Sequence, residues 1–133
     1  MNAVDTNVLI YFYDERELKR RAIATEIVKS LRDGVLLWQV ACEFIAASRR
    51  LSSMGLTPNL AWQRLGELSG FFRLVTPTPA VLDRAQILMA ERQIQFWDAM
   101  IYAACLEAGV SHIYSEDLPG QAIPNLKITN PFA

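Results

Sequence analysis

The chain has 133 residues, 52% of them hydrophobic, with 13 Lys and Arg residues against 14 Asp and Glu residues. A chain of this length can bury a core large enough to fold as one domain, residues 1–133, without a disulfide or a structural metal. One His and two separated Cys residues exclude a zinc site, and a net charge of −1 indicates neither a nucleic-acid binder nor an acidic tail.

The sequence contains no candidate for a transmembrane helix. Its longest stretch without a charged residue, residues 51–63, includes several polar residues and is shorter than the ~20 apolar residues that a membrane span requires. The N-terminus carries Asp5 where a secretory signal would have a basic segment followed by an apolar one. We therefore expect a cytoplasmic protein that does not bind membranes.

The first half of the chain alternates short apolar runs with amphipathic segments. Apolar residues recur at helical spacing between Glu15 and Arg32, and Asp33 with Gly34 ends this segment. A second helical segment ends at Gly55, a residue type that commonly follows helices. The elements predicted here are, in order, a strand over 1–4 closed by a polar turn, a helical turn over 8–13, a helix over 15–32, a strand over 35–38 and a helix over 39–54.

The second half repeats this alternation. Thr57 and Thr78 are each followed by a proline, which is typical of an N-cap with proline at the first helical position. Gly109 ends the last helical segment. The predicted elements are a helix over 58–68, a strand over 71–75, helices over 80–92 and 97–108, and strands over 112–115 and 126–128. Strands separated by helices predict an α/β fold of three layers, with a central, mostly parallel sheet of about four to five strands and helices on both faces.

Four acidic residues are predicted to lie at one edge of this sheet. Ligands of an open parallel sheet bind beyond the carboxyl ends of its strands. Asp5 closes the first strand, and Asp117 follows a later one. Glu43 and Asp98 lie near the starts of helices, whose N-termini face the same edge. The four carboxylates would therefore crowd one rim.

Each acid also has an ordinary structural explanation, because carboxylates near helix N-termini interact favourably with the helix dipole. Their neighbours argue for a further role. Asp5 and Asp98 are flanked by apolar residues, and no Lys or Arg is close to either in the sequence. A carboxylate in apolar surroundings needs a counter-charge. Oxygen ligands without His or Cys favour Mg²⁺ or Mn²⁺, so a divalent metal is a candidate for that charge.

Three polar residues, Thr6, Asn7 and Ser115, accompany these acids. Hydroxyl and amide groups beside metal-binding carboxylates can fix the conformations of those carboxylates. The same residue types are also good turn formers where a chain leaves a strand. Taken alone, each of these short motifs is explained by a turn.

Four short motifs, each containing one of the acids, occur along the chain. They are Val4-Asp5-Thr6-Asn7-Val8-Leu9-Ile10-Tyr11, Glu43-Phe44, Trp97-Asp98-Ala99-Met100-Ile101 and Tyr114-Ser115-Glu116-Asp117-Leu118. In order and spacing, these motifs resemble the PIN-domain ribonucleases, and within that family the VapC-type toxins of bacterial toxin-antitoxin pairs. The resemblance covers the whole chain.

The resemblance implies a Mg²⁺- or Mn²⁺-dependent endoribonuclease that hydrolyses RNA phosphodiester bonds. It implies an RNA substrate, a cognate protein antitoxin and a homodimeric state. The implied catalytic and metal-binding residues are Asp5, Glu43, Asp98 and Asp117. The implied supporting residues are Thr6 and Asn7, which would hold Asp5, and Ser115. Glu116 lies between two of these residues on an extended segment, so we expect its side chain to point away from them.

Three arginines, Arg16, Arg20 and Arg49, are candidate contacts for an RNA backbone, because Lys and Arg supply sequence-independent affinity for phosphates. All three also suit an exposed helix surface. Cys42 and Cys105 are expected to be buried apolar residues.

Two non-enzymatic functions remain open alternatives at this point. A phospho-accepting receiver domain shares the alternating architecture, but it places two acids near the end of the first strand, whereas Asp5 has no acidic neighbour until Asp14. A binding domain, receiver-like or inactive and PIN-like, would use the acids only as helix caps and would gain no stability from Mn²⁺.

Overall fold

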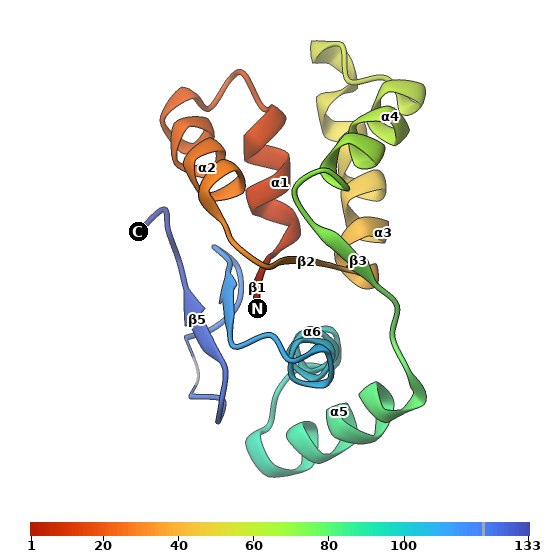
Figure 1. The fold of residues 1–133 in the computed structure, drawn as a ribbon, viewed down its shortest axis with the longest axis vertical. Coiled ribbons are helices and arrows are strands. Elements are labelled where there is room, and N and C mark those ends of the chain that lie inside the picture. The colour runs from red at the N-terminus through yellow and green to blue at the C-terminus, as the bar shows by residue number, and fades with distance from the viewer. Residues whose placement is uncertain (121) are drawn as a thin grey trace.

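Five parallel strands form the sheet at the centre of the computed structural model, which describes residues 1–120 and 122–133 (Figure 1). The strands are β1 (Asn2–Val4), β2 (Gly34–Leu37), β3 (Arg73–Val75), β4 (His112–Tyr114) and β5 (Lys127–Thr129). Their order across the sheet is β3-β2-β1-β4-β5, and every neighbouring pair is parallel. The predicted α/β class with a central parallel sheet is therefore confirmed.

The middle strand, β1, determines where the chain changes direction across the sheet. Ala3 is fully buried and pairs with Val35 of β2 on one side and with Ile113 of β4 on the other. The chain builds one half of the sheet through β2 and β3, and then crosses to the opposite side of β1 for β4 and β5. Ligands of parallel α/β sheets bind at such crossing points. In this sheet the crossing point lies beyond the ends of β1 and β4.

The helices cover both faces of the sheet, as predicted. In Figure 1, α1 to α4 gather on one side, and the packed pair of α5 and α6 lies on the other. The helical elements are α1 (Thr6–Tyr13), α2 (Leu18–Ser30), α3 (Trp38–Ala47), the 3-10 helix η1 (Ser48–Met54), α4 (Pro58–Leu68), α5 (Pro79–Arg92) and α6 (Phe96–Ala108). The predicted proline starts of α4 and α5 are both present.

Two predicted boundaries are wrong for identifiable physical reasons. Helix α1 begins directly after β1, because Asp5 caps it and no polar turn separates the two elements. The helix predicted over 39–54 loses its α-helical hydrogen bonding and continues as η1. There the hydroxyl of Ser48 donates to the carbonyl of Ile45 at 2.7 Å, and such local bonds compete with the helical pattern.

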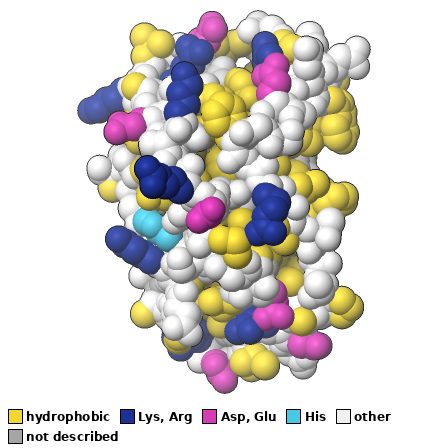
Figure 2. Space-filling model, in the orientation of Figure 1, with side chains coloured by type: hydrophobic (Ala, Val, Ile, Leu, Met, Phe, Trp, Pro, Cys, Tyr) yellow, Lys and Arg dark blue, Asp and Glu magenta, His cyan; other side chains and the backbone are white. Residues whose placement is uncertain are grey.

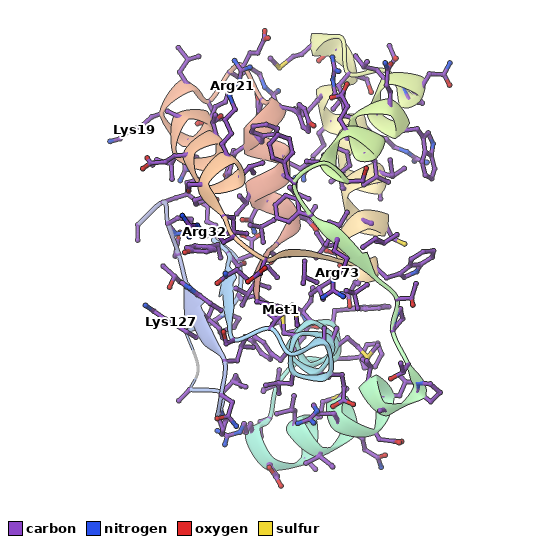
Figure 3. All side chains as sticks on the ribbon, in the orientation of Figure 1. Met1, Lys19, Arg21, Arg32, Arg73 and Lys127 are labelled. Carbon is purple, nitrogen blue, oxygen red and sulfur yellow. The ribbon has the colours of Figure 1, made fainter. Side chains whose placement is uncertain are left out.

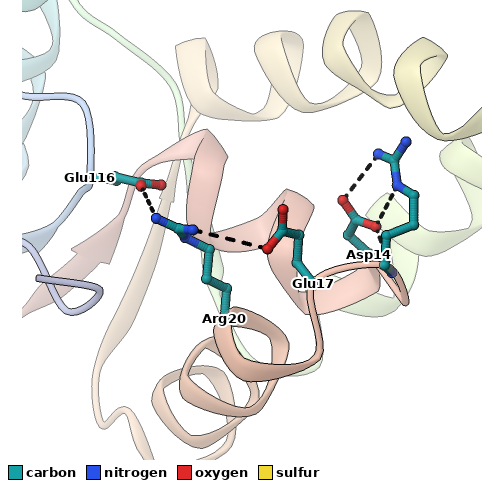
Figure 4. A network of polar contacts seen from close by, with 5 residues as sticks. Asp14, Glu17, Arg20 and Glu116 are labelled. Carbon is teal, nitrogen blue, oxygen red and sulfur yellow. Dashed lines mark hydrogen bonds and ion pairs between the residues drawn. The ribbon is translucent and has the colours of Figure 1, made fainter.

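The turn between α1 and α2 is organised by the buried carboxylate of Asp14. This carboxylate accepts hydrogen bonds from the amide and the Nε of Arg16, both at 3.0 Å, and from its Nη2 at 3.1 Å (Figure 4). The hydrogen bonds from Arg16 hold the pKa of Asp14 below its ordinary value. The compact turn explains why α2 begins at Leu18 and not at the predicted residue 15.

Cys105 is buried as predicted, whereas the prediction for Cys42 is wrong, because its side chain is exposed. Cys42 lines an apolar groove of about 360 Å³ between α3 and α6, together with Trp38, Trp97 and Met100. No helix within residues 1–120 and 122–133 is long and apolar enough to cross a membrane.

Candidate active site

The junction of β1 and α1 places Asp5 at the carboxyl edge of the sheet. The Asp5 side chain caps α1 by accepting a hydrogen bond from the amide of Thr6 at 2.8 Å. Its other carboxylate oxygen accepts a hydrogen bond from the Ser115 hydroxyl at 2.7 Å. The Asp5 amide donates to the carbonyl of Tyr114 at 2.9 Å. These bonds join the ends of β1 and β4 and hold a buried carboxylate between them.

Ser115 organises the segment that follows β4. The residue is 0% exposed, and its Oγ accepts hydrogen bonds from the amides of Asp117 and Leu118, both at 3.1 Å. The hydroxyl thus accepts from this segment and donates its one proton to Asp5. The segment therefore turns around a single hydroxyl, which brings Asp117 to the edge where Asp5 lies.

Asn7, in the first turn of α1, connects this segment to the helix. Its Nδ2 donates to Asp117 Oδ2 at 3.2 Å and to Ser115 Oγ at 3.4 Å. Its Oδ1 accepts a hydrogen bond from the amide of Glu116 at 3.2 Å. The resemblance implies that Asn7 holds Asp5. The side chain of Asn7 instead forms its hydrogen bonds with the segment that carries Asp117.

Glu43 is brought to the same edge from the second turn of α3. The hydroxyl of Thr6 donates to Glu43 Oε2 at 2.9 Å, and the amide of Gln39 donates to Oε1 at 3.0 Å. Gln39 Nε2 also lies 3.5 Å from the carbonyl of Trp97, so it bridges α3 and the start of α6. Gln39 was not among the predicted site residues, although its position one helical turn before Glu43 could have indicated the contact.

Asp98 enters the site from the start of α6. The helix begins one residue before the predicted position, and the side chain of Gln95 caps it by accepting a bond from the amide of Trp97 at 2.8 Å. Asp98 is partly buried. Within residues 1–120 and 122–133, no side chain donates a hydrogen bond to its carboxylate. Of the four acids, it is the one whose carboxylate accepts no hydrogen bond on either oxygen within the described residues.

The neighbouring acids disfavour the ionised forms of Asp5 and Asp98. Burial is the largest cause that raises the pKa of Asp5; its two hydrogen bonds oppose this effect, and the charges of Glu43 and Asp117 add to it. Burial, followed by the charges of Asp117 and Glu43, raises the pKa of Asp98. None of the ion pairs found in the described part of the chain includes any of the four acids. The site thus concentrates negative charge without a protein counter-charge.

The donor atoms of this site suit a hard divalent cation. All four acids offer carboxylate oxygens, which are the ligands that Mg²⁺ and Mn²⁺ prefer. As the side chains lie, no three Asp, Glu, His or Cys residues in the ranges 1–120 and 122–133 form a ready cation site. The four acids therefore suit such a cation by the type of their donor atoms and by their charge.

Two of the three candidate arginines are already paired with acids of this protein. Arg16 is bound to Asp14, and Arg20 is paired with Glu116. Arg49 is exposed at the start of η1. On the face shown in Figure 2, basic side chains are scattered among acidic and apolar ones and do not gather in one patch. In Figure 3, Lys19 and Lys127 project outward from α2 and β5.

The charge of Asp98 should lower the stability of the metal-free protein. Its folded pKa is raised, so the folded state disfavours the ionised form, and this cost is present above the folded pKa and disappears below the unfolded value of 3.8. We expect Asp98→Asn to raise the melting temperature in EDTA at pH 7 by a few degrees, which corresponds to about 1 kcal/mol for a chain of this size. Asp83→Asn, an exposed acid of α5, is the matched control. A melting temperature of Asp98→Asn equal to or below that of the parent protein would contradict the destabilising effect of this charge.

Several solved structures share this fold across nearly their whole length. The FitAcB structure from Neisseria gonorrhoeae is 18% identical, with a TM-score of 0.79 and 99% coverage of both chains. A toxin-antitoxin complex from Klebsiella pneumoniae is 16% identical, with a TM-score of 0.73 and coverage of 99% of this chain and 98% of that one. VapC20 from Mycobacterium tuberculosis, a sarcin-ricin loop cleaving toxin, is 15% identical, with a TM-score of 0.70 and coverage of 96% and 99%.

A comparison with curated protein sequences found no match. The family model of the PIN domain, in contrast, matches residues 3–118. This range includes β1 from its second residue on, all of β4 and all four acids at the edge of the sheet. The chain therefore belongs to the PIN domain family.

Proposed function

We propose that this protein is a metal-dependent endoribonuclease and the toxin of a type II toxin-antitoxin pair. The observation that carries the proposal is the network in which Ser115 and Asn7 hold Asp5 and Asp117 together, with Thr6 linking Glu43 to the same edge. Family membership supports this chemistry. So does the shared fold with VapC20, which cleaves the sarcin-ricin loop.

The proposed roles follow from the contacts of each side chain. The residues that would hold Mg²⁺ or Mn²⁺ are Asp5, Glu43, Asp98 and Asp117. When bound, such an ion supplies positive charge to the phosphoryl oxygens and acidifies a water molecule. Asp5, Glu43 and Asp117 have oxygens that already accept hydrogen bonds from the protein, and these bonds fix their orientation. Asp98 lacks such bonds, so its oxygens are available to accept a proton from the attacking water.

RNA cleavage should depend on both the metal and the acids. We expect the protein to cleave RNA with Mg²⁺ or Mn²⁺ and not with EDTA, and Asp98→Asn and Asp117→Asn should lower the rate on the order of 100-fold or more. Asp83→Asn, which removes an exposed acid of α5, serves as the control and should cleave like the parent. If the Asp98 and Asp117 variants cleave at the parental rate, the site assignment is wrong. If the parent neither cleaves RNA nor gains stability from Mn²⁺, the protein is a non-catalytic binding domain.

A protein antitoxin is the proposed partner in the cytoplasm. The Klebsiella pneumoniae relative in fold is a toxin-antitoxin complex, which supports this assignment. Expression of the parent in a bacterial host should arrest growth, and co-expression of the protein encoded by an adjacent short reading frame should restore it. The Asp98→Asn variant should not arrest growth. If this variant arrests growth as strongly as the parent, the toxicity does not depend on the proposed site.

We also propose that the protein is a homodimer. Leu74 on the edge strand β3 is 49% exposed, and Leu82 on the following helix α5 is 57% exposed. Large apolar side chains that are exposed at a surface favour coverage by a partner. Light scattering at micromolar concentration should give twice the monomer mass, and Leu82→Glu should lower it. A parent that remains monomeric would contradict the proposal.

A further inference from the structure

Arg20 of α2 reaches across to the segment that carries Asp117. Its Nη2 lies 2.9 Å from Glu116 Oε1, and this ion pair connects residues that are 96 positions apart in the chain (Figure 4). Residues 116–118 form a bend and not the extended segment predicted from the sequence. The side chain of Glu116 is tied to a helix outside the site.

The guanidinium of Arg20 is held in place from several sides. It lies over the ring of Tyr11 in α1, 5.4 Å from the ring centroid, and its Nη1 lies 4.0 Å from the carboxylate of Glu17 (Figure 4). Its Nε is buried and has no hydrogen-bond acceptor within the described residues. Burying a donor without an acceptor is costly, so the contacts with Tyr11 and Glu116 must offset that cost for Arg20 to remain there.

Glu116 transmits this anchoring to Asp117 through Asn7. While its side chain binds Arg20, its backbone amide donates to Asn7 Oδ1 at 3.2 Å. The Nδ2 of the same Asn7 donates to Asp117 Oδ2 at 3.2 Å. Asp117 is exposed, and this is the one hydrogen bond that its carboxylate makes within the described residues. The orientation of the Asp117 carboxylate therefore depends on the placement of the Glu116 backbone.

We propose that the Arg20–Glu116 ion pair is a positioning device for Asp117. The proposal rests on the nuclease function proposed above. Neither residue touches the reacting atoms: Arg20 fixes Glu116, Glu116 fixes the side-chain amide of Asn7, and that amide orients Asp117. A partly exposed ion pair contributes little to the stability of the whole fold, so its removal should change the site more than it changes the folding equilibrium.

This role differs from a direct phosphate contact by Arg20, and the two roles predict opposite behaviour of Glu116. If Arg20 contacted RNA, Arg20→Met would raise KM, and Glu116→Gln would free the arginine and lower KM. If the pair positions Asp117, both variants should lower kcat and leave KM nearly unchanged. The double variant should then resemble either single variant, because both substitutions break the same interaction.

The experiment compares these variants in RNA cleavage and in Mn²⁺ binding. We expect Arg20→Met and Glu116→Gln each to lower kcat about tenfold, the size of effect typical of groups that orient metal ligands. Arg20→Lys retains the positive charge and should restore most of the rate. Arg84→Met is the matched control, because Arg84 pairs with Glu107 at 2.6 Å between α5 and α6 with a similar exposure of 45% and 26%, against 38% and 22% for Arg20 and Glu116. It should cleave like the parent.

The rise in melting temperature on adding Mn²⁺ gives a readout that does not need RNA. It should be smaller for Arg20→Met and Glu116→Gln than for the parent and for Arg84→Met. Parental kcat and a parental Mn²⁺ response in both variants would overturn the positioning role and leave the nuclease function intact. A change in KM alone, or opposite effects of the two variants, would also overturn it. A parent that shows neither RNA cleavage nor a Mn²⁺ response would overturn the proposed function and this inference together.

Discussion

The hydrogen bond from Ser115 to Asp5 is the interaction on which the rest of the site depends. It joins the ends of β1 and β4, the two strands between which the chain crosses the sheet. Ser115 also accepts hydrogen bonds from the amides of Asp117 and Leu118 and from the side chain of Asn7. With these donors at its lone pairs, the hydroxyl directs its one proton to the carboxylate of Asp5. One buried hydroxyl thereby sets the placement of Asp5 and the path of the chain to Asp117.

This arrangement stabilises a carboxylate that its surroundings otherwise disfavour. Burial and the charges of Glu43 and Asp117 raise the pKa of Asp5, whereas the bonds from Ser115 and Thr6 lower it. The bonds orient the charge without neutralising it, and the described residues provide no counter-ion. Carboxylates whose charge no protein side chain neutralises retain affinity for a cation. Sites of this kind commonly lower the stability of the fold that carries them.

The places of the acids in the secondary structure could be predicted because they depend on local order: Asp5 follows a strand, and Asp98 lies in the first turn of a helix. The connections between them could not be predicted, because they join residues that are distant in the chain. Thr6 and Glu43 are 37 positions apart, and Asn7 and Asp117 are 110 positions apart. The order of the strands across the sheet decides such contacts, and apolar periodicity does not specify that order. The exposure of Cys42 escaped prediction for the same reason, since it depends on how α3 and α6 pack.

In the proposed nuclease, electrostatics would connect substrate binding to the metal. Arg16 and Arg20 are already paired with acids of the same protein. Phosphate affinity in nucleic-acid-binding proteins usually comes from free Lys and Arg side chains that release counter-ions. Here the edge that would receive the scissile phosphate carries four carboxylates, which repel it. Positive charge at this edge must then come from a bound cation, so the same ion that would serve hydrolysis would also be required for the RNA backbone to approach. In this protein, substrate affinity and catalysis would therefore share one electrostatic requirement.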